Sequence, residues 1–114
     1  MAKTETAIHR SNRDLHVAQM GRFLFWAERN PEEAFQQAQE ERDTRPWMLR
    51  ALRSSEGEAA AAAIRAIYLA SLVEAQAEVA ASKGPAKLAA QPRLRVARQR
   101  YVEVQTALSP RRRK

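Results

Sequence analysis

Basic side chains gather at the C-terminal end of this 114-residue sequence, where they could bind phosphate groups. Between residues 83 and 114 there are ten Lys and Arg residues and a single acid, Glu103, which gives the segment a net charge of +9. Residues 1–82 hold ten basic and twelve acidic residues, so the whole surplus of positive charge lies in the last quarter. Clustered Lys and Arg gain affinity for nucleic acid by releasing the counterions of its phosphates. The pattern predicts a polyanion-binding segment.

Nine of these basic residues form the candidate nucleic-acid site, because they fall on the expected last helix or just before and after it. They are Lys87, Arg93, Arg95, Arg98, Arg100, Arg111, Arg112, Arg113 and Lys114. Most are Arg, whose planar guanidinium can bond two phosphate oxygens at once. The alternative is a solvated face, or pairing with acids elsewhere in the chain, which has too few spare acids to neutralise the segment. The pattern does not separate DNA from RNA, or single from double strands, and no motif predicts sequence-specific reading.

Residues that could carry catalysis or hold a metal are sparse. With no Cys, the chain has no thiolate nucleophile, no disulfide and no cysteine zinc site. His16 has Arg13 and Met20 at the neighbouring positions of a helix face, and neither is a metal ligand. Glu74 and Glu78 lie four residues apart, but Glu on an exposed helix is commonly solvated surface. We expect no enzyme activity, no metal, no cofactor and no small-molecule substrate.

Helix-start and helix-stop signals divide the first half of the chain. Residues 1–10 show no apolar periodicity and are expected to form a flexible tail. Ser11 with Asp14 fits a capping box, which predicts a first helix from Ser11. Residues 30–31, Asn followed by Pro, predict the start of a second helix. Residues 45–46, Arg followed by Pro, predict a break after it.

The long helix of the second half is expected to be central. A short apolar helix should follow Pro46, and Ser55 with Glu58 is a second capping box that opens a helix to about Ser82. This helix is rich in Ala and apolar on nearly all sides, which is typical of a helix packed from several directions. The Lys-Gly-Pro sequence at residues 83–85 should stop this helix with a cation, a left-handed cap residue and a helix breaker. Trp26 and Trp47 lie among apolar residues at helical spacing, and we expect both in the core.

The last helix is expected from about Pro92 to Leu108, with residues 87–91 as a turn or short helical lead. Its apolar residues alternate in steps of three and four, a heptad seam two repeats long that needs a partner helix. We assign four of its members, Leu94, Tyr101, Val104 and Leu108, to a candidate interface.

These elements predict an all-α fold: a small helical bundle of four to five helices with a long Ala-rich central helix and a basic C-terminal helix and tail. One domain should cover residues 11–109, basic from residue 83, followed by a basic tail at 110–114. No apolar run reaches the length of a membrane span and no secretory signal precedes the first helix, so we expect a cytoplasmic protein. The central helix has apolar residues on nearly all sides, more than one small domain can cover. This favours a homo-oligomer or a subunit of a larger complex.

The function that these patterns favour is that of a non-enzymatic nucleic-acid-binding accessory protein. It would contact the phosphate backbone through the basic C-terminal helix and tail, within a larger nucleoprotein assembly. The alternative is a helical protein–protein interaction or assembly module whose basic face selects an acidic protein partner. A membrane-surface role has less support, because the last helix lacks Trp and Phe at its apolar edge.

Overall fold

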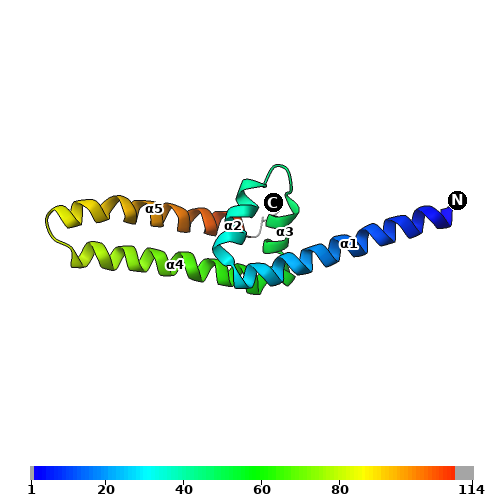
Figure 1. Cartoon of the computed structure of the whole chain (residues 1–114), viewed down its shortest axis with the longest axis horizontal. Coiled ribbons are helices and arrows are strands. Elements are labelled where there is room, and N and C mark those ends of the chain that lie inside the picture. The colour runs from blue at the N-terminus through cyan, green and yellow to red at the C-terminus, as the bar shows by residue number, and fades with distance from the viewer. Residues whose placement is uncertain (1, 110–114) are drawn as a thin grey trace.

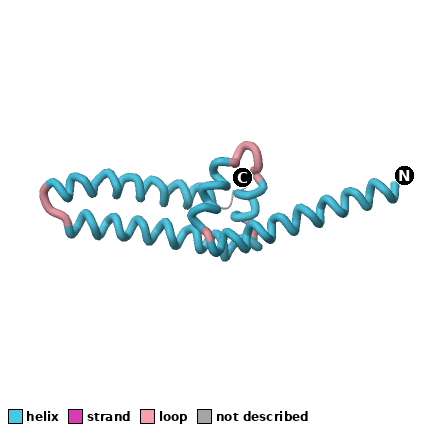
Figure 2. The backbone as a smooth tube through the Cα atoms, in the orientation of Figure 1, coloured by secondary structure: helices cyan, strands magenta, loops and turns pink. Residues whose placement is uncertain are grey.

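The computed structural model describes the backbone of residues 2–109 and the side chains of residues 14–109. Over this range the chain forms five α-helices and one short 3₁₀ helix, with no strand (Figures 1 and 2). The elements are α1 (Ala2–Arg29), α2 (Pro31–Glu40), α3 (Trp47–Arg53), η1 (Ser55–Gly57), α4 (Glu58–Ala81) and α5 (Pro85–Leu108). The expectation of a small all-α bundle is confirmed.

The bundle is elongated, with extents of 75 × 33 × 22 Å. Helices α4 and α5 run antiparallel as a hairpin that extends to one side, and the N-terminal half of α1 extends to the other (Figure 1). Helices α2 and α3 lie between these two arms, beside the start of α4 and the end of α5. The middle of the molecule therefore contains all five helices, whereas most of the hairpin contains only two.

The hydrophobic core lies in this middle region. Helix α1 contributes Phe23 and Leu24 from its C-terminal half, and α4 contributes Ile64 and Tyr68 from its first half. The other buried core residues are Ala27, Ala34, Phe35, Ala38, Met48, Leu49, Ala51, Leu52, Ala60, Ala61, Val104 and Leu108. The rings of Phe35 and Tyr68 meet edge to face with centroids 5.5 Å apart, a favoured aromatic geometry.

The predicted break between the first two helices is confirmed at Asn30 and Pro31. The side-chain nitrogen of Asn30 donates to the Trp26 carbonyl at 3.1 Å, so Asn30 closes α1 and does not cap α2 with its side chain. Pro31 is the first residue of α2, where its missing N–H has no helical partner to lose. Pro46, the predicted second break, directly precedes α3.

The start and end of the central helix also follow the sequence signals. Helix α4 begins at Glu58 after the turn of η1, although Ser55 makes no side-chain cap bond there. The hydroxyl of Ser54 instead donates to the Ala51 carbonyl at 2.6 Å and closes α3. After α4, Gly84 adopts a φ of 61°, a left-handed conformation that favours glycine, and the chain reverses into α5.

Two predicted helix starts are wrong. Helix α1 is helical from Ala2, so Ser11 lies within a helix and the tail expected at residues 1–10 is helical from residue 2 onward. That stretch contains no Gly or Pro to interrupt a helix. Helix α5 begins at Pro85 and not at Pro92, which lies inside it. Pro92 has no N–H to donate to the Leu88 carbonyl, so one helical hydrogen bond is missing. Leu88 is exposed, and water can hydrogen-bond to that carbonyl instead.

The expectation that both tryptophans are core residues holds only in part. Trp47 is half-buried and meets the Phe23 ring edge-on, with centroids 5.5 Å apart. Trp26 is 36% exposed at the edge of the core. Val17, further toward the N-terminus of α1, is exposed as well. The core ends near Met20, because α1 continues past the other helices into its arm.

Arginines from two other helices hold the C-terminal end of α5. The Arg53 Nε donates to the Ala107 carbonyl at 2.6 Å, and an Arg65 terminal nitrogen donates to the Leu108 carbonyl at 3.2 Å. The last carbonyls of a helix have no helical donors and carry partial negative charge, so cations stabilise them. These bonds fix the end of α5 against α3 and α4.

Candidate nucleic-acid interface

The basic residues of α5 form two rows, one on either side of the apolar seam. A helix turns about 100° per residue, so Arg95 and Arg98 share one side with Lys87, and Arg93 and Arg100 share the other. We call the first set the outer row and the second the groove row. The seam between the two rows packs against α4 and separates them.

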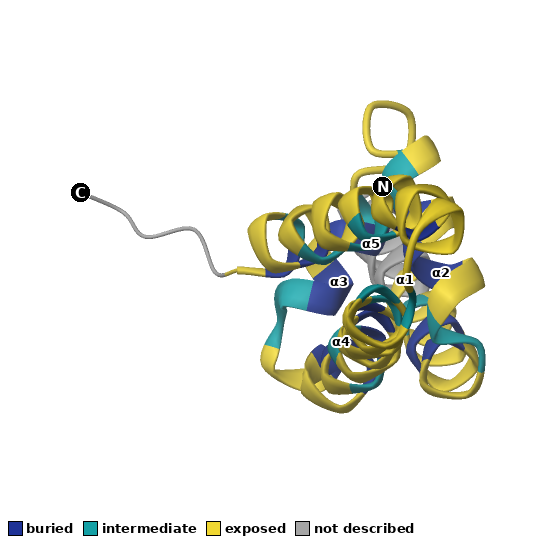
Figure 3. Ribbon diagram, turned by 90° about the vertical axis from the view of Figure 1, so that its left-hand side faces the viewer, coloured by how far each residue is buried: buried dark blue, intermediate teal, exposed yellow. Residues whose placement is uncertain are grey.

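The outer row is open to solvent. Lys87, Arg95 and Arg98 are all exposed. Within the part of the chain that the structure describes, none of the three forms an ion pair with a carboxylate. Their positive charge is therefore available to an external anion. Much of the α5 ribbon is coloured as exposed in Figure 3.

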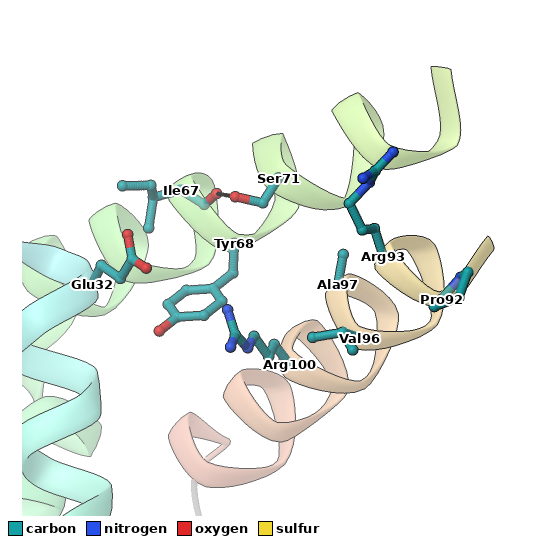
Figure 4. A pocket seen from close by; sticks show the side chains of 9 residues that line it. All are labelled: Glu32, Ile67, Tyr68, Ser71, Pro92, Arg93, Val96, Ala97 and Arg100. Carbon is teal, nitrogen blue, oxygen red and sulfur yellow. Dashed lines mark hydrogen bonds between the residues drawn. The ribbon is translucent and has the colours of Figure 1, made fainter. Parts of the chain in front are cut away.

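The groove row is partly engaged within the molecule. Arg93 forms an ion pair with Glu78 across the α4–α5 hairpin, and both side chains remain largely exposed. Exposed pairs of this kind contribute about 0–1 kcal/mol. Arg100 is exposed and its guanidinium lies near the Tyr68 ring (Figure 4). One of the two cations of the groove row is therefore paired with a carboxylate, whereas none of the three in the outer row is paired among the described residues.

An apolar groove of about 390 Å³ lies between α4 and α5, beside the groove row (Figure 4). Ile67 and Val96 line it from opposite helices, and Glu32 of α2 borders it near Tyr68. Burial is the main cause that raises the pKa of Tyr68 above its ordinary value of 10.0. The negative charge of Glu32 raises this pKa further, and the positive charge of Arg100 opposes the rise. The groove thus combines an apolar floor with charges of both signs.

The candidate interface residues of α5 face the interior of their own chain. Val104 and Leu108 are fully buried in the core, and Leu94 and Tyr101 are half-buried. The partner helix that the heptad seam requires is largely α4 of the same molecule. As an interface to another protein this assignment is wrong for Val104 and Leu108, because they keep almost no exposed surface.

Four of the nine predicted site residues lie outside the described residues: Arg111, Arg112, Arg113 and Lys114.

A second group of basic residues lies near α3. Arg45 pairs at 3.4 Å with Glu41, which lies four residues before it in the chain. Arg53 binds the end of α5. Local sequence patterns could not predict this contact, because the two residues that it joins are 54 positions apart.

Groups that would hold a metal ion are not found among the residues whose side chains are described: no three His, Asp or Glu residues cluster there. No described helix has both the length and the apolar character that a membrane span requires.

Comparisons with protein-family models, with curated proteins and with solved structures find no match to this chain. The arrangement of its own side chains is therefore the basis for a functional proposal.

Proposed function

We propose that this protein is a non-enzymatic accessory protein that binds nucleic acid through the phosphate backbone, within a larger nucleoprotein assembly. The observation that carries the proposal is the outer row of α5. Lys87, Arg95 and Arg98 are exposed and have no carboxylate partner among the described residues, in a segment whose net charge is +9. Such a surface gains affinity from counterion release.

The surroundings of the outer row favour backbone contact over base stacking. No aromatic residue lies on the outward side of α5, and its apolar residues there, Leu88 and Val102, are aliphatic. Proteins that bind single strands commonly stack bases on aromatic side chains. The absence of such a platform on this helix supports binding to phosphates with little dependence on base identity.

Binding to a short duplex DNA and to a matched RNA at a series of salt concentrations tests the proposal. The slope of log K against log salt should be steep and negative. Replacing Arg95→Gln and Arg98→Gln together should reduce its magnitude by about 2, since each neutralised phosphate contributes about 0.9. The matched control, Arg22→Gln with Arg29→Gln, removes the same charge from α1 and should leave the slope unchanged. Affinity indifferent to salt would contradict the proposal.

A second candidate is a protein interaction module that selects an acidic partner. The observation that favours it is the groove between α4 and α5, whose apolar floor is bordered by Arg93 and Arg100. An amphipathic helix can place apolar side chains in such a groove and acidic ones against the arginines. Tight binding to an acidic helical peptide, together with no measurable binding to either nucleic acid, would favour this candidate.

A further inference from the structure

The side of α4 that faces away from α5 carries no polar or charged residue along almost its whole length. Leu69 and Val73 occupy its centre and are 43% and 54% exposed. Alanines occupy the rest, all of them exposed: Ala59, Ala62, Ala66, Ala70, Ala77 and Ala80. A helix face in contact with water normally carries polar residues. We call these eight residues the outer face of α4.

The outer face of α4 has no cover within the described chain. The residues of α4 that pack inside the molecule, Ile64, Tyr68 and Leu72, point the opposite way, toward α5 and the core. Arg65, at one edge of the outer face, is turned toward the end of α5 by its bond to the Leu108 carbonyl. Figure 3 shows this side of α4 as exposed.

Two pairs of residues on the outer face are placed symmetrically about Ser71. Leu69 and Val73 each lie two residues from Ser71, and Ala62 and Ala80 each lie nine residues from it. A second copy in the antiparallel direction would place Leu69 against Val73 and Ala62 against Ala80. In a two-fold contact each side presents the same surface in reverse, so these pairs would match large with large and small with small.

The charges at the two ends of α4 fit the same antiparallel arrangement. Glu58 opens the helix and Lys83 follows its end, and both are exposed without an ion-pair partner in the described residues. Antiparallel copies bring each Glu58 near Lys83 of the second copy, twice by symmetry. A parallel arrangement would instead bring Glu58 near Glu58, and like charges repel.

We propose that the outer face of α4 is a two-fold, antiparallel interface between two copies of this chain. The interface would leave α5 free, because α5 packs on the opposite side of α4, so a dimer would present two outer rows. The proposal does not depend on nucleic-acid binding.

Helix α4 has 24 residues. At about 36 Å long and with a contact roughly 10 Å wide, it supplies about half of a standard interface. We therefore expect a dimer that dissociates on dilution.

Sedimentation equilibrium of the full chain, purified free of nucleic acid, tests for the dimer. The protein should change from monomer to dimer as its concentration rises from about 1 µM to about 500 µM. Val73→Glu should keep it monomeric, because two buried carboxylates would lie close together at the centre of the contact. Val102→Glu, a matched change at an equally exposed valine on α5, should leave the dimer intact. A native chain that stays monomeric throughout would overturn the proposal.

Disulfide cross-linking tests the direction and register, since the chain has no Cys of its own. Ala70→Cys lies close to the two-fold axis and should cross-link to itself. Ala62→Cys should not, because its two copies would lie about 27 Å apart along the helices, beyond the roughly 7 Å that a disulfide spans. A mixture of Ala62→Cys and Ala80→Cys chains should cross-link. Self-linking of Ala62→Cys would overturn the antiparallel arrangement.

Discussion

The described arginines in and beside α5 differ in what they contact, although the sequence presents all arginines alike. Arg53 and Arg65 bind the carbonyls at the end of α5. Arg93 pairs with Glu78, whereas Arg95 and Arg98 are left open to solvent. The clustering of charge was readable from the sequence, because it depends on composition alone. The roles were not readable, since they depend on which helix ends and carboxylates the fold brings within reach.

Tyr68 provides a test of the described packing at the scale of one residue. Burial raises its pKa above 10.0, so the folded protein keeps the phenolic proton at a pH where the unfolded chain begins to lose it. The stabilisation is complete below about pH 10 and declines as the pH rises toward the raised folded value. The free energy of unfolding should therefore fall with rising pH in this range, and the fall should be smaller for Tyr68→Phe. Urea denaturation between about pH 8 and pH 11 measures it. Equal slopes in both proteins would contradict the burial of Tyr68.

At the scale of elements, local signals located some helix ends and missed others. The Asn-Pro and Gly-Pro sequences at residues 30–31 and 84–85 gave correct boundaries, because Pro restricts the backbone on both of its sides. The capping box at Ser11 was misleading, since a helix that continues through it needs no cap. Pro92 was misleading as well, because an exposed helix can tolerate one missing hydrogen bond.

The junction between α3 and α4 depends on the absence of a side chain at residue 57. A Cβ atom built on Gly57 would lie 2.1 Å from the Ala51 carbonyl oxygen, which belongs to the backbone and cannot move aside cheaply. Gly57→Ala should therefore destabilise the fold by about 1–3 kcal/mol. Thermal unfolding followed by circular dichroism measures the change.

Gly21 offers the matched control for this substitution. It lies inside α1, and a Cβ atom there meets nothing within 4 Å. Gly21→Ala should be neutral or stabilising by up to about 1 kcal/mol, because Ala is the better helix former. Equal effects of the two substitutions would contradict the close approach of α3 to the start of α4.

The whole molecule differs from a closed bundle because its two arms extend in opposite directions from a small core. The sequence predicted the helices, and it predicted that α4 has apolar residues on nearly all sides. Both features follow from local periodicity. It did not predict that α4 would cover the seam of α5, or that this pairing would divide the basic residues into two rows. Those features depend on how the helices pair, and helical periodicity does not specify pairing.

The claim that the outer row of α5 binds nucleic acid can be tested most directly by observing the arginine side chains themselves. Nitrogen-15 NMR resolves the Nε–H groups of arginine, and a short duplex DNA can be added at low salt. We predict that the signals of Arg95 and Arg98 shift on addition of the duplex, while those of Arg53 and Arg65, held by carbonyls, stay in place. Unchanged signals from Arg95 and Arg98 at saturating duplex would contradict the account.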